Sequence, residues 1–302
     1  MSNKVVVRLR GGLGNQLFCY AAGRSIAIRN QAELVLDTVT DFVDDHAYGR
    51  SFALDAFSIA ARPASAAERL EPFGYWRRKA ARWLARRSPF AQRRYVVADQ
   101  RGWNPDFRHL PFDGSLTLDG YWQSYRFFQG IEPTLRADLQ PSQPAEGLTP
   151  AQRAYTGSAA DSRPPTVAVH YRSWGNRQPD SLEAIAIAYY KRAIALCEER
   201  FSSPQYQLFS DDAELARTRL SFLPRDRTAY ASAAGADPTG VSELHAMRRC
   251  DHFVIANSTF SWWGAWLGTA RGKVVIAPNP DQLHAKSFWR APELLPPEWT
   301  LL

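Results

Sequence analysis

The sequence has few cysteines and no long apolar stretch. Cys19, Cys197 and Cys250 are scattered through 302 residues without a CxxC pair, so we expect reduced thiols rather than a disulfide framework or a zinc site. No segment offers the roughly 20 apolar residues of a membrane-spanning helix. The run Val5–Val7 is too short for a signal-peptide core and is soon followed by arginine. These absences predict a cytoplasmic protein.

Acidic residues are missing from one long segment, whose basic residues account for the net positive charge of the chain. Hydrophobic residues make up 45% of the chain and charged residues 22%, as in ordinary globular proteins. The net charge is +7, yet the segment from Trp76 to Arg94 holds eight basic residues and no acidic one. The rest of the chain is therefore nearly neutral, and one basic patch has to be explained rather than a basic protein.

The beginning of the chain has the pattern of an α/β unit. Val5–Leu9 is a β-branched run that ends in glycines, and Glu33–Leu36 is a second strand candidate. Between them, Gln16–Arg29 has helical spacing. Residues 140–165 are rich in Pro, Ser, Gly and Ala and form the best linker candidate.

The C-terminal half alternates more clearly between strands and helices. A parallel sheet with helices on both faces, a Rossmann-like domain, is the expected result. We predict an α/β fold with an N-terminal domain of residues 1–150 and this second domain of residues 151–302. The expected strands are Thr166–Tyr171, Tyr206–Phe209, Phe253–Ala256 and Lys273–Ala277, and the expected helices are Ala188–Arg200, Val241–Arg249, Phe260–Leu267 and one starting near Asp212.

The segment Gly11–Gln16 joins the first predicted strand to the first predicted helix. Glycines allow a ligand to approach the backbone, and the N–H groups at a helix start bind anions. The segment resembles a dinucleotide-binding fingerprint, but Leu17 stands where the third glycine should be. A tight structural turn is an equally consistent interpretation.

His170 and Arg172 end the strand Thr166–Tyr171. Ligands of open α/β sheets bind at the carboxyl ends of strands. Arg172 could hold a diphosphate bidentately there and offset charge on a leaving group. A surface arginine and a hydrogen-bonded histidine are the structural alternative.

Two further strand ends carry polar residues. After Phe209-Ser210, a carboxylate of Asp211 or Asp212 could accept hydrogen bonds from the N1–H and exocyclic amine of guanine; capping of the next helix is the simpler alternative.

The second of these strand ends carries Asn257, Ser258 and Thr259, which also open a helix. Their hydroxyl and N–H groups would converge on a diphosphate. A cap in front of an aromatic core helix is the alternative.

Five segments, taken in order, resemble the alpha-1,2-fucosyltransferase family (glycosyltransferase family 11). The resemblance covers nearly the whole chain, and the block Ala256–Trp266 is its most specific part. It implies a GT-B-like two-domain architecture, GDP-fucose as donor, inversion at the anomeric carbon, a galactoside alpha-1,2-linkage in the glycan product, and neither metal nor other cofactor. The segments are Gly11–Phe18, Phe52–Phe57, Gly120–Ser124, Phe209–Asp212 and Cys250–Trp266.

The resemblance also implies roles for individual residues. The catalytic group would contain Arg172 as diphosphate ligand, together with His170 and Asn15. The donor-binding group would contain Gly12 and Gly14 beside the sugar, Asp211 and Asp212 near the guanosine, and Asn257, Ser258 and Thr259 at the phosphates.

One motif departs from the family pattern His-x-Arg-Arg-Gly-Asp. His170 and Arg172 are kept, but the chain continues Ser-Trp-Gly-Asn, and the substitutes Asn176 and Asp180 are out of register. The departure leaves open a related GDP-deoxysugar or another L-sugar as donor, or a glycan- or nucleotide-sugar-binding protein without catalysis.

The general base also stays open. The candidates are Asp37, His46, a donor phosphate oxygen and His170, whose ordinary pKa suits proton transfer.

The basic segment 76–94 has the pattern of a helix lying on anionic lipid. Trp76, Ala80, Trp83 and Leu84 would share one helical face, with arginines around them. Peripheral contact at the inner leaflet of a bacterial membrane would bring the enzyme to a lipid-linked acceptor. An ordinary solvated helix is the alternative, and no nucleic-acid partner is expected, because no RNA-binding motif accompanies the patch.

Overall fold

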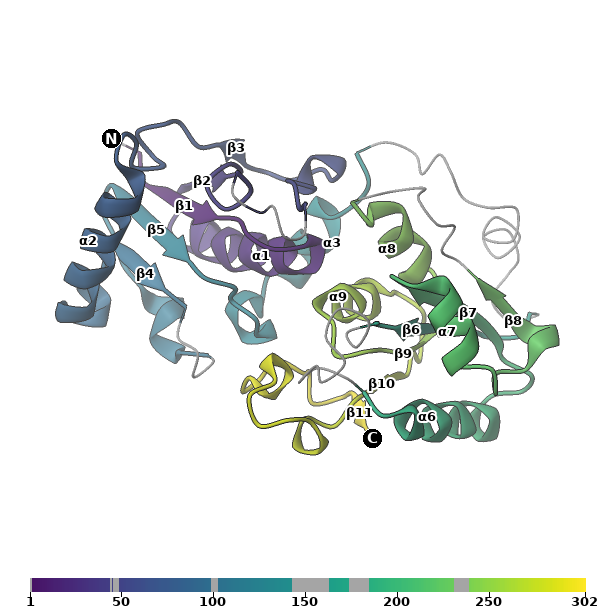
Figure 1. Cartoon of the computed structure of the whole chain (residues 1–302). Helices are drawn as coiled ribbons and strands as arrows, with labels where there is room; N and C mark the ends of the chain where they lie inside the picture. The colour runs from purple at the N-terminus through teal and green to yellow at the C-terminus, as the bar shows by residue number, and fades with distance from the viewer. Residues whose placement is uncertain are drawn as a thin grey trace. The chain divides into compact units, whose positions relative to one another are not determined.

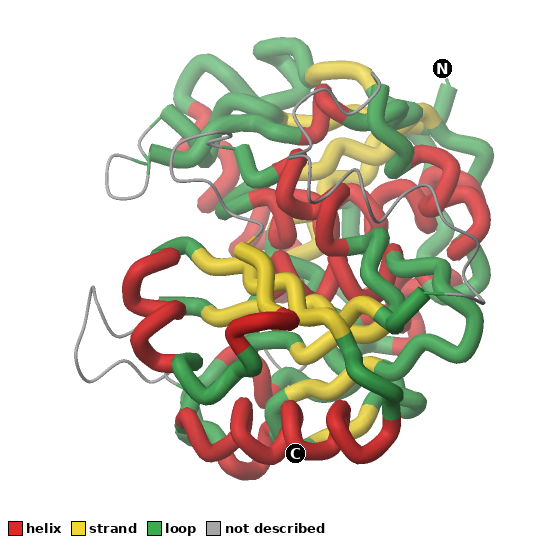
Figure 2. The backbone as a smooth tube through the Cα atoms, turned by 90° about the vertical axis from the view of Figure 1, so that its right-hand side faces the viewer, coloured by secondary structure: helices red, strands yellow, loops and turns green. Residues whose placement is uncertain are grey.

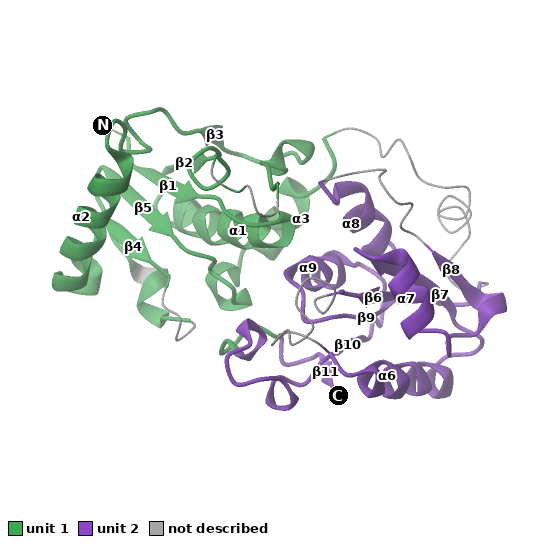
Figure 3. Ribbon diagram, in the orientation of Figure 1, with its two compact units in different colours: residues 1–143, 291–295 green, residues 144–290, 296–302 purple. Residues whose placement is uncertain are grey.

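The computed structural model divides the chain into two compact units (Figure 3). Unit 1 comprises Met1–Gln143 with Ala291–Leu295, and unit 2 comprises Pro144–Arg290 with Pro296–Leu302. The return of Ala291–Leu295 to unit 1 was not expected from the sequence. The structure describes residues 2–43, 45, 49–98, 103–142, 163–173, 185–230 and 239–302. The predicted boundary after residue 150 lies outside these ranges.

Unit 1 is built on a five-stranded parallel sheet with the order β3-β2-β1-β5-β4 (Figure 1). The strands are β1 (Lys4–Arg8), β2 (Glu33–Asp37), β3 (Arg62–Pro63), β4 (Tyr95–Val97) and β5 (Ser115–Asp119). The helices are α1 (Leu13–Arg29), α2 (Gly74–Arg87) and α3 (Glu132–Asp138).

Helix α1 packs closely on the central strands. It begins at Leu13, earlier than the predicted Gln16, because Gly12 is its N-cap. A Cβ on Gly23 would lie 2.3 Å from the Val7 side chain and 3.1 Å from Leu34. The glycine therefore permits the helix to approach both β1 and β2.

A buried carboxylate joins four elements of unit 1. Asp119, 1% exposed, ends β5 directly beside Arg8, which ends β1. It accepts hydrogen bonds from Arg8 (2.9 Å), Arg10 (3.0 Å), Arg82 of α2 (2.6 Å) and Tyr95 of β4. Burial by itself raises the pKa of a carboxyl, but these donors lower the pKa of Asp119 below its ordinary value.

Unit 2 is built on a six-stranded parallel sheet with the order β11-β10-β9-β6-β7-β8. Counted along the chain from β6, this is the order 3-2-1-4-5-6 of dinucleotide-binding folds. The strands are β6 (Thr166–Tyr171), β7 (Gln205–Ser210), β8 (Thr228–Tyr230), β9 (His252–Val254), β10 (Val275–Ala277) and β11 (Thr300–Leu301). The helices are α6 (Ile187–Arg200), α7 (Ala213–Arg219), α8 (Val241–Met247) and α9 (Thr259–Leu267).

Alternate residues of the central strands face different helices. Val167 and Val169 of β6 share a core cluster with the buried side of α6 and with Ala216 of α7. His170, on the opposite face, packs on Phe260 of α9, with ring centroids 5.5 Å apart. The predicted parallel sheet with helices on both faces is therefore confirmed, and Figure 2 shows the strands in yellow among the red helices.

The three cysteines are buried, and none forms a disulfide. Burial raises the pKa of each thiol to about 12, so they remain protonated and unreactive at neutral pH. No helix in the described ranges is both long enough and apolar enough to cross a membrane.

The Asp119→Asn variant tests the buried charge cluster. Three arginines lose a shared buried counter-charge, so the free energy of unfolding of unit 1 should fall by about 3 kcal/mol. Urea unfolding followed by circular dichroism measures this change. Asp113→Asn, at an exposed position of the same unit, is the matched control, and equal stability of the two variants would contradict the interpretation.

Candidate active site

The strand order in the sheet of unit 2 reverses at β6. The chain adds β7 and β8 on one side of β6 and then β9, β10 and β11 on the other. Because all these strands are parallel, the residues after β6, β7 and β9 meet at one edge. Ligands of open α/β folds bind at such a switch point.

Arg172 is held at this edge by Asp211. The Nη1 of Arg172 lies 3.1 Å from the Oδ2 of Asp211, and the other carboxylate oxygen accepts the backbone N–H of Ser173 at 2.9 Å. The side chains of Arg172 and Asp211 are 30% and 27% exposed. The guanidinium is thus oriented by the end of β7 while part of it stays accessible to an anion.

His170 lies beside the first turn of α9 and is uncharged at neutral pH. Its side chain is buried against Phe260, and Tyr190 donates to its backbone oxygen at 3.1 Å. Burial, together with the charge of Arg172, lowers the pKa of His170 to about 3. Its Nδ1 is buried without a hydrogen-bond partner among the described residues. Such an atom can bond to a bound ligand, but the ring is a poor proton acceptor.

Asp212 caps helix α7, which is the alternative to guanine binding that the sequence left open. Its Oδ1 accepts the backbone N–H of Leu215 at 3.0 Å. The hydroxyl of Ser210 bonds to both the backbone N–H and the carbonyl of Asp212. The two adjacent carboxylates thus differ: Asp211 contacts Arg172, and Asp212 fixes the start of a helix.

The segment Asn257–Thr259 connects β9 to α9 at the same edge. Asn257 is fully buried, Ser258 occupies the N-cap position, and Thr259 is the first helical residue. The Ser258 side chain makes no capping hydrogen bond. The first N–H groups of a helix have no acceptor within it, so this helix start suits an anion.

Three tryptophans of α9, together with Trp299, hold this helix in place. Trp262 and Trp263 are fully buried, and Trp262 packs on Trp266 and on Trp299, with centroids 6.2 and 5.5 Å apart. The predicted aromatic core helix and the polar helix start are therefore two properties of one element.

The remaining candidates, Asn15, Gly12 and Gly14, lie in unit 1. Asn15 is in the first turn of α1, and its Oδ1 accepts a hydrogen bond from Gln123 at 2.8 Å. Gly11 has φ +70°, and a Cβ there would lie 2.6 Å from the Asn15 amide. Gly11 therefore makes the turn at the carboxyl end of β1, Gly12 is the N-cap of α1, and Gly14 lies in the first turn of that helix.

The structure separates the candidates for a general base. Asp37 is 2% exposed, and its Oδ1 accepts the backbone N–H groups of Val39 and Thr40. It stabilises a turn, which argues against proton transfer. The other side-chain candidate in unit 1, His46, lies outside the described residues, as do Asn176 and Asp180, the possible substitutes in the family motif.

The sequence analysis did not identify three residues that hold the candidate site residues in position. Ser173 and Tyr190 fix the β6 end, and Gln123 fixes Asn15. The only available signal was the Gly120–Ser124 motif, which contains Gln123. No three His, Cys, Asp or Glu side chains in the described ranges are grouped to hold a metal ion.

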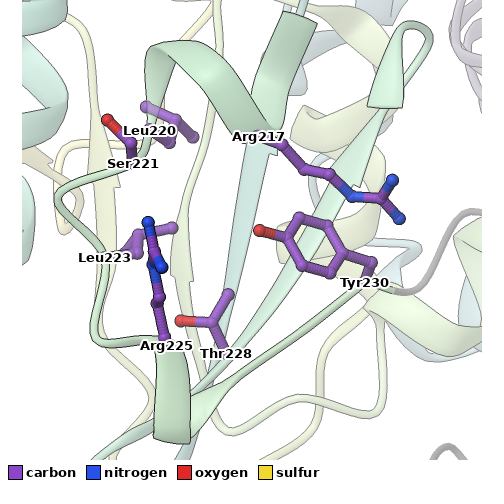
Figure 4. A pocket seen from close by; sticks show the side chains of 7 residues that line it. All are labelled: Arg217, Leu220, Ser221, Leu223, Arg225, Thr228 and Tyr230. Carbon is purple, nitrogen blue, oxygen red and sulfur yellow. The ribbon is translucent and has the colours of Figure 1, made fainter. Parts of the chain in front are cut away.

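A pocket of about 350 Å³ opens elsewhere in unit 2, on the flank of β8 (Figure 4). It contains none of the predicted site residues and does not lie at the switch point. Its lining residues are Arg217, Leu220, Ser221, Leu223, Arg225, Thr228 and Tyr230.

Comparison with known proteins assigns the family. Residues 92–302 match the family model "Glycosyl transferase family 11". The chain belongs to glycosyltransferase family 11. It is therefore a glycosyltransferase, and the family resemblance of its motifs is confirmed.

Two relatives come from Escherichia coli. An alpha-1,2-colitosyltransferase is 27% identical over 96% of this chain and 97% of its own. The O-antigen biosynthesis glycosyltransferase WbnK is 33% identical over 91 residues, which are 30% of this chain and 29% of that protein.

Solved fucosyltransferase structures share the fold. NodZ from Bradyrhizobium has a TM-score of 0.51 at 17% identity, over 88% of this chain and 92% of that one. A mutant of Arabidopsis thaliana FUT1 in complex with GDP has a TM-score of 0.57 at 12% identity, over 91% and 70%. The predicted GT-B-like α/β fold is confirmed.

The low pKa of His170 predicts a pH dependence. The unfolded chain takes up a proton near pH 6.5 but the folded one only near pH 3, so His170 destabilises the fold as the pH falls between these values. Its contribution approaches about 1.4 kcal/mol per pH unit.

Imidazole carbon shifts in labelled protein, assigned with His170→Gln, test this expectation. A neutral ring at pH 5 is the expected result, and a ring that titrates near pH 6 would contradict it.

Proposed function

We propose that this glycosyltransferase moves L-fucose, or a related deoxysugar, from a GDP-sugar to a hydroxyl of a glycan acceptor. The transfer inverts the anomeric carbon, forms an alpha-1,2-linkage to a galactoside and uses no metal ion. The observation that supports the proposal best is the Arg172–Asp211 pair at the switch point that also carries the start of α9.

The donor diphosphate would bind between two positive groups on neighbouring strands. Arg172 follows β6, and the hydroxyl groups of Ser258 and Thr259 and the first N–H groups of α9 follow β9, which pairs with β6. A guanidinium and a helix start both favour negative charge. Together they offset the charge that develops on GDP as it leaves, the task that a metal ion performs in other transferases.

The guanosine would lie toward the β7 end of the same edge. Asp211 and Asp212 both follow β7, and we assign to a carboxylate oxygen of this pair the N1–H and amine of guanine. Because Asp211 already contacts Arg172, it is first of all a positioning residue for the arginine. Asn257 is fully buried and directly precedes Ser258 and Thr259 at the start of α9.

In the reaction, the bond between the anomeric carbon and the diphosphate oxygen breaks, and the acceptor oxygen bonds to that carbon from the opposite face. The acceptor hydroxyl loses its proton. His170 is neutral and buried, so we assign it to donor binding through its Nδ1 rather than to proton transfer. We assign the proton to a donor phosphate oxygen, because Asp37 holds a turn and His170 is buried and neutral.

The relatives' names bear on the substrates. The name of the first Escherichia coli relative specifies colitose instead of fucose, which supports the broader class of deoxysugars. The second relative acts in O-antigen biosynthesis, so we propose a polysaccharide acceptor, lipid-linked and reached from the cytoplasm.

A second candidate function is binding of a nucleotide sugar without transfer. It rests on the departure of the chain from the family pattern after Arg172. Binding and turnover experiments separate the two functions.

Thermal unfolding with added nucleotides tests the donor site. In the presence of EDTA, GDP or GDP-fucose at about a hundredfold excess over Kd should stabilise the protein by about 2.7 kcal/mol, whereas UDP and CDP should not. Arg172→Ala should abolish the shift, and Arg225→Ala, in the pocket beside β8, should retain it. A folded protein that responds to no guanine nucleotide would rule out the proposed donor.

Turnover tests the role assigned to Arg172. Arg172→Lys keeps a charge but loses the planar fork, so kcat with GDP-fucose and a β-galactoside should fall about a hundredfold. Asp211→Asn should lower kcat about tenfold, because the arginine is less well oriented. Arg225→Lys is the control. Wild-type kcat in Arg172→Lys would refute this role, and tight GDP-fucose binding without turnover would favour the second function.

A further inference from the structure

Helix α2 has an inner and an outer face of very different character. The inner face consists of Arg78, Ala81, Arg82 and Ala85, at helical spacing. Ala85 is buried, Arg78 donates to the Arg69 carbonyl at 3.0 Å, and Arg82 bonds to Asp119. These contacts fix the orientation of the helix on unit 1, where it lies beside β4 (Figure 1).

The outer face exposes large apolar side chains. Trp76 is 64% exposed, Trp83 56% and Leu84 60%, and Ala80 lies between them on the same side. Five of the twelve exposed large hydrophobic side chains of the described chain fall within residues 73–84. Solvent exposure of so many large apolar groups in one place is characteristic of a binding surface.

Basic side chains surround this apolar strip. Lys79, Arg86 and Arg87 are exposed, and no ion pair joins them to a carboxylate in the described ranges. The Arg87 guanidinium lies 3.7 Å from the centroid of the Trp83 ring, and the Lys79 ammonium lies 5.5 Å from that of Trp76. The sequence contains no acidic residue from Pro72 to Ala98.

We propose that α2 is a membrane-docking helix that lies on a bilayer surface containing anionic lipid. Trp76, Trp83 and Leu84 would enter the interfacial layer, and Lys79, Arg86 and Arg87 would pair with phosphate groups. Tryptophan suits the boundary between headgroups and acyl chains, and basic residues add attraction to anionic headgroups. The inference does not depend on the proposed reaction.

Charge complementarity favours this occupant over two others. A second copy of this chain would bring the same basic surface against itself, which like charges oppose. A nucleic acid would match the charge, but Leu84 and Ala80 offer it no stacking surface. A bilayer interface uses every part of the face, aliphatic, aromatic and basic.

Flotation with lipid vesicles tests the proposal on the full chain. The wild type should float with phosphatidylcholine vesicles that contain about 30% phosphatidylglycerol at about 0.1 M salt, but not with phosphatidylcholine alone. About 0.5 M salt should weaken the binding by screening. The triple variant Lys79→Gln, Arg86→Gln, Arg87→Gln should lower the partition coefficient about a hundredfold, and Trp76→Ser with Trp83→Ser at least tenfold.

The controls separate a local surface from net charge and from misfolding. Arg249→Gln, Arg271→Gln, Lys286→Gln removes the same charge from exposed positions in unit 2 and should float like the wild type. All variants should keep the wild-type Tm, because the altered side chains are exposed. Brominated lipids should quench tryptophan fluorescence in the wild type, and Trp76→Phe with Trp83→Phe should still float but lose most of this quenching.

Three results would overturn the proposal. The wild type fails to float with anionic vesicles, or the unit 2 control loses binding as strongly as the α2 variant. In the third, Trp76→Ser with Trp83→Ser changes only self-association in sedimentation or binding to a mixed-sequence RNA, and leaves flotation unchanged.

Discussion

The pairing of β6 with β7 on one side and β9 on the other is the constraint on which the candidate site depends. Three strand ends then share one edge, although the residues that follow them are separated by tens of positions in the sequence. The alternation of side chains along β6 turns His170 toward α9. The tryptophans of α9 anchor the helix in the core and leave its polar start at the edge. Packing and site formation are therefore consequences of one arrangement.

Both units have an arginine at the carboxyl end of a central strand and an aspartate at the same end of its neighbour, but burial gives the pairs different uses. In unit 1, Asp119 is 1% exposed and accepts from three arginines, which makes it a structural connection between strands and α2. In unit 2, Arg172 and Asp211 are each partly exposed. A buried pair that is already satisfied has little to offer a ligand, whereas the partly exposed pair can exchange solvent for a diphosphate.

The sequence was sufficient to predict the elements whose signal is local. Thr166–Tyr171 is predicted and observed with the same limits, since a buried parallel strand needs only a continuous apolar run. Strands β8 and β11 have three and two residues, too few for any periodicity. The partners of Asp119 and the contact of Asp211 with Arg172 depend on strand register over long separations, which no single sequence reveals. The roles assigned to the site residues stay predictions.

The two candidate roles of a strand-end carboxylate, helix cap and ligand contact, divide between adjacent residues here. Asp212 satisfies the start of α7, so it cannot turn away without exposing the unpaired N–H of Leu215. Asp211 does not cap the helix and bonds instead to Arg172 and to the backbone of Ser173. The Ser-Asp-Asp sequence is thus explained by geometry: the second aspartate fixes the helix, and this fixed start directs the first aspartate toward the edge where the arginine lies.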